Sequence, residues 1–322
     1  MTIETTPGLV FGPVPSRRLG RSLGVNNIPP KVCSYSCIYC QVGSTLNQTV
    51  ERQTFYRPEE IVQAVAAKRA AVEAAGDTVD YVTFVPDGEP TLDLHLGQAI
   101  VLIRSLGVRV AVITNGSLVW REDVQQELLP ADWVSLKVDA VNEQIWRTMN
   151  RPAPGLKMDD VLQGMQAFAR RYKGTLTTET MLVSGVNDEA DCLTQTAQFA
   201  ARLAPATAYL ALPTRPPAEP WVRPADEHRM LHAYHLFQQH LSKVEYLTEF
   251  EGTEFVPSGP AAQGLLDITA VHPMREEAVR AFLARAGMEW AVVQELLKHG
   301  QLVQTEYQGQ RFYLRRFSPQ KT

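Results

Sequence analysis

Three of the four cysteines in this sequence lie within eight residues, at Cys33, Cys37 and Cys40. This spacing places three thiols on one short loop, and the irons of iron–sulfur clusters select deprotonated sulfur over nitrogen or oxygen. Three thiolates can hold three corners of a four-iron cube, and the loop offers no fourth ligand. The loop therefore predicts a [4Fe-4S] cluster in which one iron is open to an outside molecule.

Two other uses of these cysteines fit the sequence less well. A structural zinc site normally has four protein ligands, and the histidine nearest to the loop is His95. Two disulfides would require Cys192 to pair with one of three closely spaced partners, and the N-terminus lacks a secretory signal pattern. We therefore expect Cys192 to be a free thiol and the protein to be cytoplasmic.

The overall composition indicates a globular protein without a strong charge. Of the 322 residues, 45% are hydrophobic and the net charge is −4, which points to neither a nucleic acid nor a membrane partner. No uncharged apolar run reaches the length of about 18 residues that a membrane helix needs. The length favours one large domain followed by a small one.

Helix-length segments alternate with short runs rich in valine and aromatic residues. We expect six strands, near residues 22–28, 79–85, 108–114, 133–138, 174–184 and 208–212. We expect helices near residues 58–75, 94–106, 121–129, 158–171, 189–203 and 224–241. This alternation predicts parallel strands with right-handed crossovers, hence an α/β fold. Six units are too few to close an eight-strand barrel, so we expect a partial (β/α)6 barrel whose chemistry lies at the C-terminal strand ends.

The C-terminal residues follow a different pattern. A Gly- and Pro-rich linker at 251–264 is expected to join the barrel, residues 1–250, to a small module at 265–322. We expect two helices near 274–286 and 289–299, then a hairpin of 301–306 with 311–317, the outline of a winged helix. From residue 298 onward five basic residues face one acid. The module could dock a nucleic acid or acidic peptide, or serve as a lid or dimer contact.

The cysteine spacing, with the aromatic Tyr39 before the last cysteine, resembles the signature of radical S-adenosylmethionine (SAM) enzymes. The resemblance implies that Cys33, Cys37 and Cys40 ligate the cluster at the catalytic centre and that its open iron binds SAM. It also implies a partial barrel. The implied reaction cleaves SAM into methionine and a 5′-deoxyadenosyl radical, which abstracts hydrogen from a substrate.

Two further motifs follow predicted strands. Gly88-Glu89-Pro90 comes after the second strand, where it could form a simple turn. The resemblance instead makes it the segment that binds the methionyl amino group of SAM. Thr114 and Asn115 end the third strand, where they form either a common turn or polar groups of the cofactor pocket.

Charged residues also alternate on the fourth strand. Ser135, Lys137 and Asp139 share one face. A charge inside a barrel is costly unless it is paired or contacts a polar ligand, so we assign Lys137 and Asp139 to the cofactor or substrate pocket. On the fifth strand Glu179 and Met181 share a face, and the pattern leaves open whether that face points inward.

Three other sets of polar residues can each be interpreted either as structural or as functional. Three arginines near the N-terminus suggest an exposed loop, or a grip on a phosphate or carboxylate near the cluster. They are Arg17, Arg18 and Arg21. Asn150-Arg151-Pro152 could reach substrate or terminate a helix. Three histidines share one helical face, and we expect a partly exposed surface rather than a metal site. They are His228, His232 and His235.

A combination of four motifs extends the resemblance to one subfamily of these enzymes. The segments 12–20, 33–40, 88–92 and 149–152 together resemble iron–sulfur oxidoreductases similar to wyosine-tRNA synthesis enzymes, over most of residues 10–320. This implies a tRNA or peptide substrate and an electron donor such as flavodoxin or ferredoxin, with no membrane partner. Only Cys192 remains for the second cluster that some wyosine enzymes carry.

A different class of function is also compatible with a cluster and a winged helix. The protein could be a redox-sensing regulator whose cluster reports oxidation while the winged helix binds nucleic acid. The Gly-Glu-Pro motif and the six-unit pattern favour an enzyme, because a sensor needs no cofactor pocket.

Overall fold

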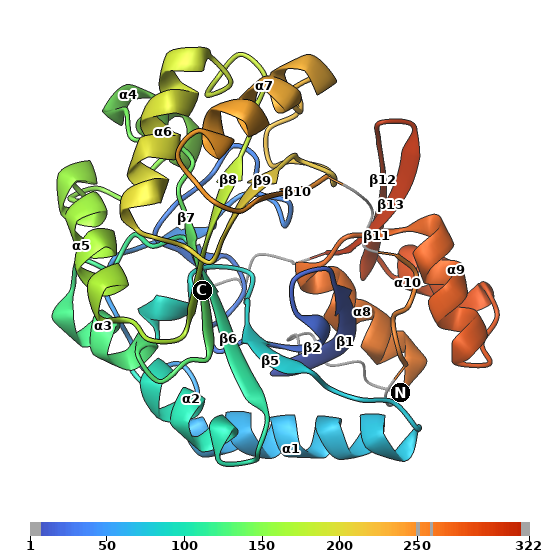
Figure 1. The fold of residues 1–322 in the computed structure, drawn as a ribbon. Coiled ribbons are helices and arrows are strands. Elements are labelled where there is room, and N and C mark those ends of the chain that lie inside the picture. The colour runs from blue at the N-terminus through green and yellow to red at the C-terminus, as the bar shows by residue number, and fades with distance from the viewer. Residues whose placement is uncertain (1–7, 249–251, 258–259, 317–322) are drawn as a thin grey trace.

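A curled sheet of eight strands carries the cysteine loop, in the order β1-β2-β5-β6-β7-β8-β9-β10 (Figure 1). The computed structural model describes residues 8–248, 252–257 and 260–316. Strand β1 (Val10–Ser16) runs antiparallel to β2 at one edge. The parallel strands are β2 (Gly20–Val25), β5 (Tyr81–Phe84), β6 (Arg109–Thr114), β7 (Trp133–Lys137), β8 (Thr175–Met181), β9 (Thr207–Ala211) and β10 (Val244–Leu247). The predicted α/β fold with a partial barrel is confirmed.

Helices cover the outer side of the sheet (Figure 1). They are α1 (Pro58–Ala74), α2 (Leu96–Arg104), α3 (Glu122–Leu128), α4 (Glu143–Asn150), α5 (Met158–Arg171), α6 (Ala190–Arg202) and α7 (Glu227–Gln238). Start and stop signals in the sequence predicted most of these helices. Helix α1, for example, starts with Pro58 and has Glu59 and Glu60 in its first turn, where carboxylates favour the helix dipole. It buries Ile61 and Val65 against the sheet.

Two strands of the sheet were not predicted. Strand β1 occupies the first part of the segment for which the sequence allowed an exposed loop, and Arg17, in the turn after it, is exposed. Phe11 of β1 packs on Gly24 of β2, where a Cβ atom would lie 1.9 Å from the phenyl ring. Strand β10 is short and only partly buried. Neither strand therefore shows a clear alternation of apolar and polar residues.

Helix α4 was also not predicted. The side chain of Asn142 accepts a hydrogen bond of 3.1 Å from the backbone N–H of Ile145, which caps the start of the helix. The helix ends at Asn150, and Arg151 follows in the left-handed conformation with φ 46°. The segment Asn150-Arg151-Pro152 thus terminates a helix, which was one of its two interpretations.

The C-terminal module contains three helices and a three-stranded antiparallel sheet of order β11-β13-β12. In chain order its elements are α8 (Ala261–Val271), β11 (Met274–Arg275), α9 (Glu276–Arg285), α10 (Ala291–Lys298), β12 (Leu302–Tyr307) and β13 (Gln310–Arg315). Helix α8 begins inside the predicted linker, whose residues 251, 258 and 259 lie outside the described residues. The predicted helix from 274 starts instead as β11. The assignment as a winged helix, and the domain bounds, remain predictions.

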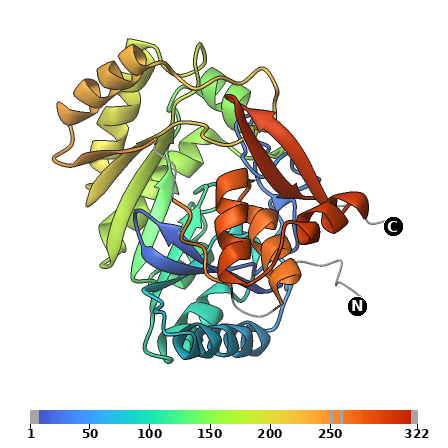
Figure 2. The same cartoon turned by 90° about the vertical axis from the view of Figure 1, so that its right-hand side faces the viewer.

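The module packs beside the β1 edge of the sheet, and its helices lie in front of the sheet in Figure 2. Asp267 of α8 accepts a hydrogen bond of 3.0 Å from the backbone N–H of Gly8 and forms a buried ion pair of 3.3 Å with Arg315. Arg311 pairs with Glu276 at 2.6 Å. Both arginines are thus used within the module, while Lys321 lies outside the described residues. Among the described residues, no helix has the length and apolar composition that a membrane crossing requires.

Candidate functional site

The cysteine loop leaves the C-terminal end of β2 and lies against the Gly-Glu-Pro turn that follows β5. The backbone N–H of Glu89 donates to the carbonyl of Val32 at 3.1 Å, and the N–H of Lys31 donates to the carbonyl of Asp87 at 2.7 Å. Gly88 has φ 154°, and a Cβ atom there would lie 1.9 Å from the Val32 carbonyl oxygen. Glycine at this position therefore permits the two loops to touch.

The end of α4 holds the other side of the cysteine loop. The N–H of Ser36 donates to the carbonyl of Asn150 at 3.0 Å, and the N–H of Ile38 donates to the carbonyl of Met149 at 2.9 Å. Just beyond the helix, the N–H of Ala153 donates to the carbonyl of Ser34 at 2.8 Å. Backbone from two separate parts of the chain, the Gly-Glu-Pro turn and the end of α4, thus shapes the loop.

Two side-chain amides point at sulfur atoms of the loop. Nδ2 of Asn115, after β6, lies 3.6 Å from Sγ of Cys33. Nδ2 of Asn150, at the end of α4, lies 3.5 Å from Sγ of Cys37. Hydrogen bonds to sulfur stabilise the negative charge of thiolate ligands and help to set the potential of a cluster. The sequence predicted a polar role for Asn115 but left Asn150 open.

The three thiols repel one another as anions. Burial, followed by the charge of Glu89, raises the pKa of Cys33 well above its usual value. Burial and the neighbouring Cys40 raise the pKa of Cys37 to about 12. Burial and Asp87 also raise the pKa of Cys40. Three crowded thiols of this kind ionise when bound iron supplies positive charge, so the donor set fits an iron–sulfur cluster.

A single metal ion fits the described residues less well. Within residues 8–248, 252–257 and 260–316, no three His, Cys, Asp or Glu side chains are grouped closely enough to hold one ion. The thiolates of a cube each bind a different iron, so they need not converge on one point. The histidine stripe lies on α7, where His228 and His235 are exposed and His232 is half-buried.

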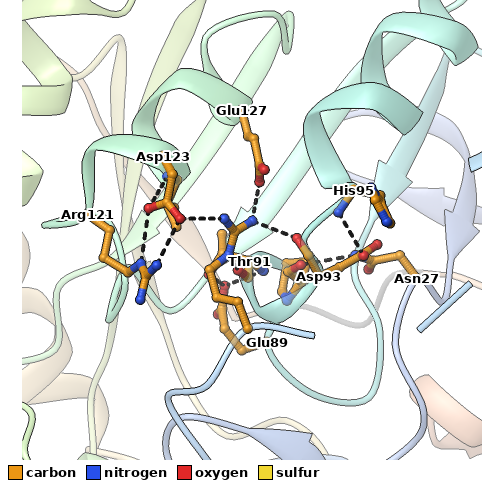
Figure 3. A network of polar contacts seen from close by, with 11 residues as sticks. Asn27, Glu89, Thr91, Asp93, His95, Arg121, Asp123 and Glu127 are labelled. Atoms are coloured by element: carbon orange, nitrogen blue, oxygen red, sulfur yellow. Dashed lines mark hydrogen bonds and ion pairs between the residues drawn. The ribbon is translucent and has the colours of Figure 1, made fainter. Parts of the chain in front are cut away.

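Glu89, which lies beside Thr91 in Figure 3, links the ends of β5 and β6 through both of its carboxylate oxygens. Oε1 accepts hydrogen bonds from the Thr91 N–H at 3.0 Å, the Thr91 hydroxyl at 2.5 Å and the Thr114 hydroxyl at 2.6 Å. Oε2 accepts one from the Asn115 N–H at 2.8 Å. Burial raises the pKa of Glu89, and these donors act in the opposite direction. The carboxylate thus brings three of the predicted site residues together, while Pro90 begins the short helix η1 (Pro90–Leu92).

Arg52 holds this turn through two backbone carbonyls, and no sequence motif pointed to it. Its side chain is 2% exposed. Nε donates to the Thr91 carbonyl at 2.8 Å, and Nη2 donates to the Asp93 carbonyl at 2.7 Å. The guanidinium also pairs with Asp123, at 2.9 Å, and with Glu127, which both extend from α3 towards the turn (Figure 3).

Asp139, which follows β7, contacts the cysteine loop through the side chain of Tyr39. Its carboxylate accepts hydrogen bonds from the Tyr39 hydroxyl, from Asn150 Nδ2 at 2.8 Å and from the Met181 N–H at 2.8 Å. These three donors come from the loop, from α4 and from the end of β8. Tyr39 and Asp139, which the sequence assigned to the pocket separately, are therefore direct partners.

Lys137 and Arg18 hold the carboxylate of Glu179 between them. Lys137 Nζ lies 2.8 Å from Oε1, and Arg18 Nη1 lies 2.5 Å from Oε2. Burial alone would raise the pKa of Glu179, but the Lys137 and Arg18 charges lower it to about 2. Glu179 therefore faces the inside of the barrel. Arg18 is half-buried and paired rather than a solvated charge, whereas Arg17 and Arg21 are exposed.

The family model described as "Radical SAM superfamily" matches residues 27–194. The UPF0026 protein MJ1312 of Methanocaldococcus jannaschii is 43% identical over 309 residues, which cover 95% of this chain and 96% of that protein.

Two solved structures share the fold at low identity. One, "Structure of TYW1 with a lysine-pyruvate adduct bound", gives a TM-score of 0.53 at 19% identity and covers 69% of this chain and 74% of that one. The other, a radical SAM methyltransferase from Sphaerobacter thermophilus, gives 0.53 at 16% identity and covers 70% of this chain and 66% of that one.

Proposed function

The chain belongs to the radical SAM superfamily, whose members use a [4Fe-4S] cluster and SAM, and we propose from that premise that it abstracts a hydrogen atom from a tRNA or peptide substrate. The substrate would bind over the C-terminal strand ends, beside the cysteine loop. One observation carries the proposal: two side-chain amides, from Asn115 and Asn150, point at two sulfurs of a three-cysteine loop that also touches the Gly-Glu-Pro turn.

Some residues of this chain would hold the cluster, and others would position SAM or support the cysteine loop. Cys33, Cys37 and Cys40 would hold the cluster. When bound, the cluster and SAM supply the 5′-deoxyadenosyl radical. Gly88-Glu89-Pro90, braced by Arg52, would position the methionyl end of SAM, with Thr114 and Asn115 beside it. Tyr39 and Asp139 would support the loop, and Lys137 with Glu179 would form the wall towards the substrate.

The first experiment measures 5′-deoxyadenosine. The protein is reconstituted anaerobically with iron and sulfide, reduced with dithionite and incubated with SAM. Wild type should contain the cluster and release 5′-deoxyadenosine. Cys33→Ala should lose both, whereas Cys192→Ala, which removes the cysteine outside the loop, should keep both. SAM cleavage that persists in Cys33→Ala would contradict the proposal.

The substrate class needs its own test. With tRNA or peptide pools present, a substrate should increase the release of 5′-deoxyadenosine and change in mass itself. Flavodoxin or ferredoxin should replace dithionite as the electron donor. The alternative of a redox-sensing regulator has no support among the comparisons, where the named structural neighbours include a methyltransferase.

A further inference from the structure

A buried ion pair joins the cysteine loop to the strand end before the Gly-Glu-Pro turn. Nζ of Lys31 lies 2.9 Å from Oδ2 of Asp87, and the two side chains are only 9% and 4% exposed. Asp87 directly precedes the turn, and Lys31 comes two residues before Cys33. The pair thus connects the segment that carries the thiols to the segment proposed to position SAM.

Lys31 also holds the chain beyond the third cysteine. Its Nζ donates to the carbonyl of Val42, two residues after Cys40. Its own carbonyl accepts hydrogen bonds from the N–H groups of Leu46 at 3.1 Å and Asn47 at 3.0 Å. Lys31 therefore lies before the three cysteines and contacts the chain that follows them.

The backbone of Lys31 has an unusual conformation. Its φ is 64°, in the left-handed region that is unfavourable for a residue with a Cβ atom. Such a conformation persists where surrounding contacts hold it, and it is common at functional sites. Here the Lys31 N–H donates to the Asp87 carbonyl at 2.7 Å, while the ammonium pairs with the carboxylate of the same residue. These two contacts fix the direction of the lysine side chain.

The C-terminal module helps to keep bulk water away from this pair. Ala270 and Val271 of α8, together with Tyr56, line a cavity beside Asp87. The cavity has a volume of about 10 Å³, which leaves room for about one water molecule. Charges interact more strongly where bulk water is excluded, so the pair can influence the nearby thiols.

Both charges of the pair act on Cys40. Burial raises the pKa of Cys40 most, Asp87 raises it further, and Lys31 lowers it. Nearby charges shift the pKa of a thiol in these directions because they favour or disfavour the thiolate. Asp87 has the larger effect of the two, so the pair as a whole makes the surroundings of this sulfur more negative.

We propose that Lys31 and Asp87 are a positioning pair, which sets the charge around Cys40 and, through this ligand, the reduction potential of the bound cluster. Burial, charge and hydrogen bonds around a cluster determine its potential. A negative charge nearby disfavours the reduced, more negative cluster, and a positive charge favours it. The inference rests on the proposed function, because the proposed reaction begins with the reduced cluster.

The test is the reduction potential of the full chain with its cluster reconstituted, measured without SAM. A redox titration followed by electron paramagnetic resonance gives the potential. The titration is run at about pH 8, where the Asp87 carboxyl is ionised, because burial raises its pKa to about 6 against the opposing effect of Lys31.

Asp87→Asn should raise the potential. The expected change is a roughly tenfold gain in the equilibrium constant for reduction, or about 59 mV for one electron. Asparagine keeps an oxygen that can accept a hydrogen bond from Lys31, so the loop should keep its fold. Asp87→Glu keeps the negative charge and should have the potential of wild type.

A double variant tests the lysine. Lys31→Met combined with Asp87→Asn removes both charges and leaves neither of them buried without its partner, so it is the variant least prone to unfolding. Its potential should lie between those of wild type and Asp87→Asn, because Asp87 has the larger effect on Cys40. The matched control is the exposed pair of Lys298 and Glu295. Lys298→Met and Glu295→Gln should each leave the potential unchanged.

Three potentials would overturn the positioning pair. They are a potential of Asp87→Asn equal to or below wild type, a potential of Asp87→Glu shifted as far as that of Asp87→Asn, and a potential of the double variant equal to or above that of Asp87→Asn. Loss of the cluster in Asp87→Asn that Asp87→Glu restores would also overturn it, because the carboxylate would then have a structural role only.

Release of 5′-deoxyadenosine, measured afterwards on the same samples with SAM added, separates the two proposals. Release by wild type, with potentials that do not follow the charges of Lys31 and Asp87, would remove the role of the pair and keep the radical chemistry. Potentials that follow these charges, without SAM cleavage by wild type, would keep the role of the pair and contradict the proposed function.

Discussion

The Nδ2 atom of Asn150 lies 3.5 Å from the Sγ atom of Cys37, although 113 positions separate the two residues. The same amide nitrogen lies 2.8 Å from the carboxylate of Asp139. Through one side chain, the end of α4 is thus joined to a predicted cluster ligand and to the strand face below it. Asn150 is therefore expected to influence both the cluster and the stability of its loop.

Replacing Asn150 by alanine should lower the reduction potential of the cluster. The change removes a donor to the Cys37 sulfur, and such a donor favours the more negative, reduced cluster. A net hydrogen bond of about 0.5–1.5 kcal/mol corresponds to a shift on the order of tens of millivolts for one electron. A redox titration followed by electron paramagnetic resonance measures the potential.

The control for this variant is Gln144→Ala, an exposed residue of the same helix. It should leave the potential unchanged. A potential in Asn150→Ala equal to that of wild type would show that the amide does not act on the cluster.

Glu89→Gln should both destabilise the protein and weaken SAM binding. The carboxylate oxygens accept hydrogen bonds from two hydroxyls and two backbone N–H groups. A glutamine places its own NH₂ group against one set of these donors, which costs about 1–3 kcal/mol for a buried group. Denaturant unfolding gives the free energy, and equilibrium dialysis with labelled SAM gives the affinity.

Glu289→Gln is the matched control, because Glu289 is an exposed carboxylate in the C-terminal module. It should change neither quantity. If Glu89→Gln bound SAM like wild type while remaining destabilised, Glu89 would have a structural role only.

The pH dependence of stability should reflect Glu179. Its pKa is held at about 2 in the folded protein by Lys137 and Arg18, after the opposing effect of burial, against roughly 4.3 in an unfolded chain. The unfolded state therefore takes up the proton first as the pH falls. This contribution to the free energy of unfolding is complete above about pH 4.3 and is lost between there and about pH 2.

Lys137→Met should reduce that contribution and lower the stability at pH 7 by about 3–5 kcal/mol, because it leaves a buried carboxylate with one partner fewer. Denaturant unfolding between pH 7 and pH 3 measures both effects. Lys173→Met, at an exposed lysine, is the control. An unchanged acid limb in Lys137→Met would mean that Lys137 does not set the pKa of Glu179.

Replacing Arg52 should destabilise the Gly-Glu-Pro turn. Arg52→Met removes donors from the Thr91 and Asp93 carbonyls and the partner of two carboxylates. The loss should be about 3–5 kcal/mol of unfolding free energy, with weaker SAM binding. The stability and SAM affinity of Arg52→Lys should lie between those of wild type and Arg52→Met, because lysine keeps the positive charge but lacks the forked donors of the guanidinium. Equal SAM affinity in all three proteins would contradict a role for Arg52 in the turn.

Sequence reasoning succeeded where the signal is local. The spacing of Cys33, Cys37 and Cys40, the turn at Gly88 and the alternation of helices with apolar strands are each contained in a short stretch of chain. It failed for β1, whose strand conformation depends on pairing with β2 and on the fit of Phe11 over Gly24. It also missed α4, although the cap at Asn142 is a local signal.

The sequence by itself determined the family, the class of fold and the loop on which Cys33, Cys37 and Cys40 lie together. Only the tertiary structure decided that Asn150 reaches Cys37, that Arg52 supports the turn of Glu89 and that Arg18 closes on Glu179. In a sequence, each of these side chains looks like an ordinary solvated polar residue. A hydrogen bond or ion pair depends on distances between side chains that the fold brings together from positions 39 to 161 residues apart, and no local pattern records such distances.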